Sequence, residues 1–130
     1  TLGRPSVMQD NPQYYNVLKD VILFLSKQIN QLNLLGVNDI IIDPGFGFGK
    51  TLEDNFELLN QLNHFAFLEA PILVGLSRKS MIYKSLNNDP KDALNGTTAL
   101  HMIALKQGAH ILRVHDVKEA KECIQLFKSL

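Results

Sequence analysis

Three short apolar runs, separated by segments with helical periodicity, constrain the fold of this chain more than any other feature. The runs cover residues 37–43, 71–75 and 109–116, and they recur roughly every 30 to 40 residues, the length of a strand–helix–strand unit. Each run is nearly all apolar, which is typical of parallel strands covered on both faces. We therefore expect an α/β fold with about three parallel strands and four or more helices.

The segments around the runs carry apolar residues at intervals of three and four, which predicts amphipathic helices. Thr51 and Asp54 fit a capping box, Asp89-Pro90 fits a helix start, and Gly108 fits a helix end. Helices are expected over residues 13–35, from residue 52, over residues 90–107 and from residue 117. The expected buried positions are Leu18, Val21, Ile22, Leu25, Ile29 and Leu32 in the first helix, Leu52, Phe56, Leu59 and Leu62 in the second, and Val117, Ala120, Ile124 and Phe127 in the last.

A sheet of three parallel strands has two open edges, so it rarely forms an independent domain. The 130-residue chain begins with a polar, turn-rich stretch over residues 1–11 and then a long helix, as though a preceding strand were missing. Thr1 in place of methionine points to processing or truncation. Residues 1–130 are therefore expected to form one part of a larger (β/α) barrel.

Composition excludes several classes of function. Thirteen Lys and Arg residues balance thirteen Asp and Glu residues, so there is no electrostatic signal for nucleic acid or an anionic membrane. The longest apolar stretch, residues 21–25, is too short to cross a bilayer. Cys123 is the only cysteine, and its apolar helical neighbours favour a buried thiol. A cytoplasmic protein is the resulting expectation.

The first run ends in Asp43 and continues into a loop of glycine and phenylalanine residues. Ligands of α/β proteins bind at the carboxyl ends of the strands, and glycine lets the backbone approach a ligand closely. Asp43 could therefore accept hydrogen bonds from an amino-substituted heterocycle, with Phe48 packed on its flat ring. Equally, Asp43 could cap the loop, and both Phe46 and Phe48 could belong to the core.

The same loop has partial matches to two nucleotide-binding motifs. Pro44 stands where a Walker A loop needs its first glycine, and Lys50 stands where a dinucleotide fingerprint needs its third. Neither kind of phosphate-binding loop therefore fits.

The other two runs lead into basic residues. Residues 77–80, Ser-Arg-Lys-Ser, follow Gly75 and could offer a cation and a hydroxyl to a ligand, or form a solvated basic turn. Arg113 and His115 alternate along the third run, so they share a face, and two inward cations favour a phosphate or pyrophosphate. Asp116 is expected to cap the next helix. Three other histidines are expected to be structural or surface groups: His64, His101 and His110.

Taken together, the motifs closely resemble those of dihydropteroate synthase. They are Asp43-Pro44-Gly45-Phe46-Gly47-Phe48-Gly49-Lys50-Thr51, Gly75-Leu76-Ser77-Arg78-Lys79-Ser80 and Arg113-Val114-His115-Asp116-Val117, with Asn95-Gly96-Thr97-Thr98-Ala99 before the last run. The resemblance covers essentially the whole chain. It implies the carboxy-terminal part of a (β/α)8 TIM barrel, with strands six to eight and helices five to eight.

The resemblance also implies a transferase of folate biosynthesis, a family that sulfonamides target. Such enzymes condense 6-hydroxymethyl-7,8-dihydropterin pyrophosphate with 4-aminobenzoate, giving dihydropteroate and pyrophosphate. The implied substrate-binding residues are Asp43, Phe48, Gly75 and Lys79 for the pterin, Lys79 and Ser80 for 4-aminobenzoate, and Arg113 and His115 for the pyrophosphate. The implied catalytic residues among them are Lys79, Arg113 and His115.

The amino-terminal half of that family carries an asparagine associated with Mg²⁺, two mobile catalytic loops and further pterin-binding groups. This chain contains none of them, so no metal ligand is expected in it, and the isolated chain is expected to have negligible synthase activity. Its open strand edges are expected to associate with a second copy, giving a homo-oligomer.

Two alternatives remain open. One is the pterin-binding barrel of a methyltetrahydrofolate–corrinoid methyltransferase, which shares the aspartate at the strand end. The motifs around Lys79 and Arg113 disfavour it, because they point to a pyrophosphate substrate. The other alternative is a non-catalytic fragment that associates with itself or with a complementary half.

Overall fold

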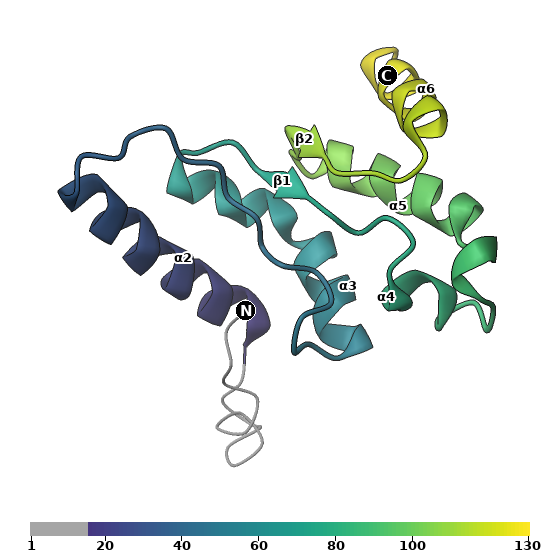
Figure 1. Cartoon of the computed structure of the whole chain (residues 1–130), viewed down its shortest axis with the longest axis horizontal. Coiled ribbons are helices and arrows are strands. Elements are labelled where there is room, and N and C mark those ends of the chain that lie inside the picture. Colours follow the sequence, from purple (N-terminus) through teal and green to yellow (C-terminus); the bar gives the residue numbers. More distant parts are fainter. Residues whose placement is uncertain (1–15) are drawn as a thin grey trace.

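A computed structural model describes residues 16–130, in which a row of helices lies along a small parallel sheet (Figure 1). The elements in chain order are α2 (Val17–Leu34), α3 (Leu52–Asn60), the 3₁₀ helix η2 (Leu62–Leu68), β1 (Leu73–Val74), α4 (Ser80–Tyr83), the 3₁₀ helix η3 (Pro90–Asp92), α5 (Leu94–Lys106), β2 (Ile111–Leu112) and α6 (Val117–Lys128). The expected loop over residues 1–11 and the first residues of the expected helix at 13–15 lie outside the described residues.

The three apolar runs lie side by side and parallel, as predicted, but the strands are short. β1 pairs with β2, with Leu73 opposite Ile111. The first run joins this sheet through a single parallel bridge between Ile42 and Ile72. The amide of Ile42 donates to the Pro71 carbonyl at 2.8 Å, and the Leu73 amide donates to the Ile42 carbonyl at 2.7 Å. The expected strand over residues 37–43 is therefore wrong in extent, because residue 42 alone forms a bridge.

The two faces of these strands differ in burial. Ile42, Ile72 and Val74 point toward the helices and are 0–2% exposed; we call this the closed face. Successive strand residues point to opposite sides, so the other side is lined by a set that we call the open face: Ile41, Asp43, Leu73, Gly75, Ile111, Arg113 and His115. Ile41 is 56% exposed and Ile111 is 37% exposed. One face of the described strands is therefore uncovered, which is consistent with the expectation that the chain forms part of a larger barrel.

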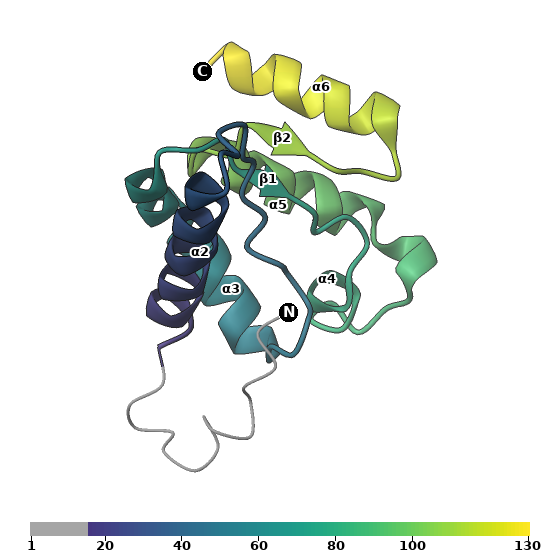
Figure 2. The same cartoon turned by 60° about the vertical axis from the view of Figure 1, so that its left-hand side comes forward.

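The helices form a layer against the closed face. α2 packs on α3, α3 on α5, and α5 on α6, and this order can be followed in both views (Figures 1 and 2). The core between helices and strands includes Leu58, Leu62 and Phe65, all fully buried. None of the described helices is long and apolar enough to span a membrane.

Several predicted helix ends are confirmed. Thr51 Oγ1 accepts the Asp54 amide at 3.0 Å, and Asp54 accepts the Thr51 amide at 3.2 Å, so the capping box is present. Gly108, at φ +105°, follows α5. The expected continuous helix over residues 90–107 is instead a 3₁₀ turn followed by α5, because Ala93 between them departs from helical geometry.

Two predicted core positions are wrong, and one predicted cap is absent. Leu52 is 37% exposed and Val117 is 60% exposed. Each is the first residue of its helix, where a side chain lies at the rim of the packed surface. Leu58 is buried although it was not among the expected positions, and Cys123 is buried as predicted. Burial raises the pKa of the Cys123 thiol. Asp116 precedes α6, but its side chain makes no capping hydrogen bond.

Candidate functional site

The candidate site lies where the three parallel runs end. Asp43 follows the bridge residue Ile42, Gly75 follows β1, and Arg113 follows β2. Parallel strands place their carboxyl ends at one edge of a sheet, where ligands of α/β proteins bind. The structure thus brings together three elements that the sequence places far apart.

Asp43 is exposed and begins a tightly held glycine loop. One of its carboxylate oxygens accepts the Gly45 amide at 2.9 Å, so the carboxylate does cap the loop, as one interpretation expected. Gly45 and Gly47 have φ values of +79° and +96°, which favour glycine. The Gly47 amide donates to Asn55 Oδ1 at 2.7 Å, and Asn55 Nδ2 donates to the Thr51 carbonyl at 3.0 Å.

Asn55 is a residue that the sequence reasoning missed. It is 2% exposed and lies on the buried side of α3. Its amide links the glycine loop to the helix that follows, and so fixes the loop beside Asp43. A polar residue at an apolar helical position was the signal that could have revealed it.

The two phenylalanines of the loop have different environments. Phe46 is fully buried in the core, whereas Phe48 is 54% exposed. Lys50 donates to the carbonyl oxygens of Gly45 at 2.5 Å and Phe48 at 3.4 Å, so it supports the loop from within. Phe48 is therefore the aromatic ring that a ligand at this edge could reach.

Lys79 connects the glycine loop to the basic residues of the other strand ends. Its Nζ donates to the Phe46 carbonyl at 2.6 Å and lies 5.0 Å from the centre of the Phe48 ring. Burial lowers the pKa of Lys79, the nearby Arg113 lowers it further, and Asp43 opposes this change. Lys79 therefore lies within the electrostatic reach of both the acid and the arginine of the site.

Arg113 lies across Gly75. A Cβ atom built on Gly75 would be 2.6 Å from Nη2 and 2.9 Å from Nε of Arg113. The resemblance implies that Gly75 contacts the pterin, but in this structure the Arg113 guanidinium fills the space beside Gly75. Only glycine at residue 75 leaves room for this position of the arginine.

Arg113 and His115 are both exposed and Val114 between them is half-buried, which is consistent with the predicted alternation. Its amide donates to Ser77 Oγ at 3.2 Å, and its Nδ1 lies 2.9 Å from the same oxygen. Ser80 is the half-buried first residue of α4. These contacts join the loop after β1 to the loop after β2.

The remaining histidines are structural or surface groups, as predicted. His64 is exposed and His101 is buried. The Ile72 amide donates to Nδ1 of His110 at 3.0 Å, which ties the start of β2 to the neighbouring strand.

The edge offers one carboxylate, an exposed aromatic ring and three basic side chains. The carboxylate can accept hydrogen bonds from a donor-bearing heterocycle, and the ring can cover a flat ligand. Arginine and histidine can bind a phosphate or pyrophosphate group. The arrangement therefore suits a flat heterocycle that carries a polyanion.

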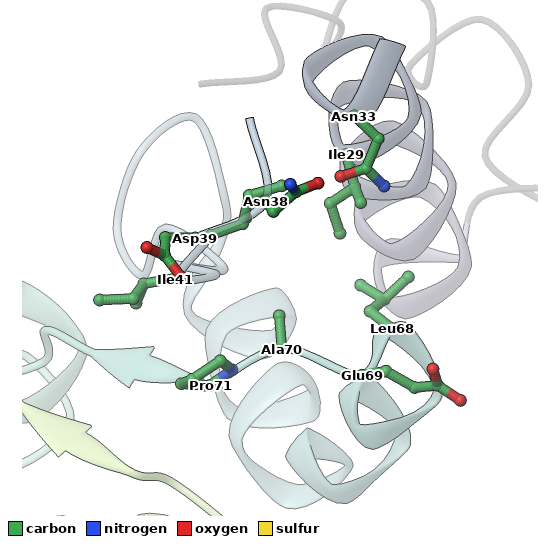
Figure 3. A pocket seen from close by; sticks show the side chains of 10 residues that line it. Ile29, Asn33, Asn38, Asp39, Ile41, Leu68, Glu69, Ala70 and Pro71 are labelled. Carbon is green, nitrogen blue, oxygen red and sulfur yellow. The ribbon is translucent and has the colours of Figure 1, made fainter. Parts of the chain in front are cut away.

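A separate hollow of about 540 Å³ lies at the opposite ends of the strands (Figure 3). Its polar lining comes from Asn33, Asn38, Asp39 and Glu69, and none of its lining residues is basic. It does not suit a polyanion. Among residues 16–130, no group of three or more His, Cys, Asp or Glu side chains is placed to hold a metal ion.

Comparison with known proteins identifies similar sequences. Residues 1–115 match the family described as pterin binding enzymes. Dihydropteroate synthase of Escherichia coli K12 is 43% identical over 129 residues, which cover 98% of this chain and 46% of that protein. The bifunctional dihydropteroate synthase/dihydropteroate reductase of Helicobacter pylori is 41% identical over 130 residues, 34% of its length.

Solved structures of dihydropteroate synthases, which are TIM barrels, match the fold. The Yersinia pestis enzyme superimposes with a TM-score of 0.86 at 40% identity, covering 89% of this chain and 49% of that one. The Thermus thermophilus enzyme in complex with 4-aminobenzoate gives a TM-score of 0.85 at 40% identity, covering 90% and 46%. This chain thus spans less than half the length of these relatives.

Proposed function

The chain belongs to the family of pterin binding enzymes, and on this premise we propose that it is the carboxy-terminal part of a dihydropteroate synthase barrel. The function proposed for the complete barrel is the condensation of 6-hydroxymethyl-7,8-dihydropterin pyrophosphate with 4-aminobenzoate in the cytoplasm. The observation that carries this proposal is the meeting of Asp43, Lys79 and Arg113 at one strand edge, in a chain 43% identical to the E. coli synthase.

Each side chain of the edge has a separate task in this proposal. Asp43 accepts hydrogen bonds from the pterin, and Phe48 covers one side of its ring. Lys79 lies between the pterin and 4-aminobenzoate, with Ser80 on the 4-aminobenzoate side, where a sulfonamide would compete. Arg113 and His115 bind the pyrophosphate.

The proposed reaction requires stabilisation of the charge on the leaving group and positioning of the two substrates. The carbon–oxygen bond to pyrophosphate breaks, the electron pair leaves with the pyrophosphate, and the pterin stabilises the resulting cation. The amine of 4-aminobenzoate then forms the new carbon–nitrogen bond and loses a proton. Arg113 and His115 stabilise the negative charge that grows on the leaving group, so no strong base is required.

The position of Arg113 over Gly75 adds a step to ligand binding. The guanidinium fills the space beside Gly75 that the pterin is proposed to occupy. Binding of the pyrophosphate draws the guanidinium away from the strand, and the pterin ring enters the vacated space. The substrate thereby prepares its own site.

Mg²⁺ adds positive charge at the pyrophosphate when it is bound. Among residues 16–130, no group of three or more His, Cys, Asp or Glu side chains is placed to hold this ion, and we propose that its ligand lies in the amino-terminal half of the barrel. No step assigned to this chain requires a metal ligand from residues 16–130.

The role of Asp43 can be tested by calorimetry with a pterin pyrophosphate analogue. We expect Asp43→Asn to weaken binding at least about tenfold, because the amide cannot accept both hydrogen bonds of the pterin edge. Asp39→Asn is a matched control, since Asp39 is an exposed carboxylate on the same run at the opposite end. Equal binding by wild type and Asp43→Asn would contradict the proposal.

Synthase activity can be tested by complementation. The 130-residue polypeptide alone should show no turnover, and activity should appear when it is mixed with the amino-terminal half of the E. coli relative. Turnover by the polypeptide alone would show that the site is complete within it.

The open strand edges and the exposed apolar residues of the open face also favour a homo-oligomer. A monodisperse monomer in light scattering would exclude this assembly.

A further inference from the structure

Arg78 has no role in the site described above, yet it makes more side-chain hydrogen bonds than its neighbours Ser77 and Lys79. Its Nε and Nη2 donate to the two carboxylate oxygens of Asp116, at 2.9 and 3.1 Å. Its Nη1 donates to the carbonyl oxygens of Pro90 and Lys91, at 2.8 and 3.1 Å. One guanidinium therefore joins the loop after β1, the turn η3 and the start of α6.

The backbone of Arg78 is held in an unusual conformation. Its φ is +54°, in the left-handed region that residues other than glycine rarely adopt. The Arg78 amide donates to Thr97 Oγ1 of α5 at 3.0 Å. Left-handed residues persist only where their surroundings hold them, and they gather at functional sites.

The residues beside this ion pair are those that the proposed function uses. Arg78 lies between Ser77 and Lys79, and Asp116 follows His115. The Ser77–His115 contact is a second link between the same two loops. Any movement of the Arg78–Asp116 pair would therefore shift Lys79 and His115 relative to one another.

We propose that Arg78 is a positioning residue that, with Asp116, holds Lys79 and His115 at their distance across the site. The proposal rests on the proposed function. The planar guanidinium can form two parallel hydrogen bonds with a carboxylate and still reach two carbonyls, whereas a lysine ammonium cannot reproduce that geometry. The pair also holds each group in its charged form, since the mutual hydrogen bonds raise the pKa of Arg78 and lower that of Asp116.

The chain contains a control pair close by. Lys118 and Glu122 form an ion pair of 3.0 Å on α6, with side chains 77% and 61% exposed. The Arg78 and Asp116 side chains are each 23% exposed. Exposed pairs of this kind contribute little to structure, so Lys118→Gln removes a neighbouring ion pair without disturbing the site.

The test uses amide hydrogen exchange on the 130-residue chain with Arg78→Lys, Asp116→Asn and Lys118→Gln. We expect the first two variants to exchange about tenfold faster at residues 77–80 and 113–116, with the core amides of α3 and α5 unchanged. Lys118→Gln should match wild type. If Arg78→Lys does not fold, the isosteric Asp116→Asn variant decides the question.

Unchanged exchange in the two loops would overturn the proposal. Faster exchange throughout α3 and α5 would also overturn it, because Arg78 would then stabilise the whole fold. A second measurement is pyrophosphate binding by the same variants, where we expect a loss of at least about tenfold in Arg78→Lys. If wild type binds no pyrophosphate, the proposed anion site fails, and the exchange result alone decides the role of Arg78.

Discussion

The closed and open faces of the three strands are built from the same runs of sequence but serve different purposes. Ile42 and Ile41 are neighbours in one run, yet the first is 2% exposed and the second is 56% exposed. The closed face packs against the helices. The open face carries Asp43, Arg113 and His115 above exposed apolar residues such as Ile41 and Ile111.

The difference indicates that stability and chemistry are largely separate in this chain. Apolar burial supplies most of the free energy of folding, and it is concentrated between the closed face and the helix layer. Charged groups on the open face keep access to a ligand. Substitutions on the closed face should therefore change the free energy of unfolding, and those on the open face should change ligand binding.

The largest expected contrast is between two adjacent isoleucines. Ile42→Ala should lower the free energy of unfolding by about 2–5 kcal/mol, because it leaves a cavity beneath the helices. Ile41→Ala should change it by no more than about 0.5 kcal/mol, because the side chain is exposed. Urea denaturation of both variants, followed by circular dichroism, measures the two values.

Equal losses at Ile41 and Ile42 would show that the open face is covered in solution, by a second copy or another segment. The same two denaturation measurements can be repeated after each variant is mixed with the amino-terminal half of the E. coli relative. In that assembly Ile41 should become buried, and Ile41→Ala should then weaken the association.

A smaller contrast is expected between two glycines. A Cβ atom at Gly96 of α5 would lie 2.6 Å from Cγ2 of Ile82, a packed side chain. Overpacking costs about 1–3 kcal/mol, and the better helix propensity of alanine returns about 1 kcal/mol. Gly96→Ala should therefore lower the free energy of unfolding by up to about 2 kcal/mol, measured by urea denaturation.

Gly75→Ala should affect ligand binding more than the free energy of unfolding. The three atoms nearest to its Cβ would all belong to the guanidinium end of Arg113, which can rotate away. We expect little change in the free energy of unfolding but weaker binding of a pterin pyrophosphate analogue in calorimetry, because the added methyl group would occupy the space proposed for the pterin ring. Unfolding of Gly75→Ala at lower urea than Gly96→Ala would contradict the separation of the two faces.

Much of the fold could be predicted because its signals are local. Periodicity gave the helices, the Thr51–Asp54 pair gave a capping box, and the apolar runs gave three parallel segments. The short length of the strands could not be predicted from those runs. The length of a strand depends on hydrogen bonds to a neighbouring strand. Residues 37–41 form no bridge within the described part of the chain.

The candidate site shows a similar limit. Alternation placed Arg113 and His115 on one face, and the motifs singled out Asp43 and Lys79. Contacts between distant segments were not visible in the sequence: Asn55 holding the glycine loop, and Asp116 pairing with Arg78 in place of a helix cap. Such contacts depend on how three strands and a helix are packed together.

The smallest expected effect concerns His101 of α5, a titratable group on the packed side of the molecule. Burial lowers its pKa from the ordinary value of 6.5, with Asp116 opposing, and its Nε2 makes no hydrogen bond with the described residues. As pH falls through 6.5, the unfolded chain binds a proton that the folded chain does not, so the free energy of unfolding should decrease between about pH 7 and pH 5. His101→Gln should reduce this decrease in urea denaturation, whereas His64→Gln, at an exposed position, should retain it. The same decrease in His101→Gln as in wild type would place the acid-sensitive group elsewhere.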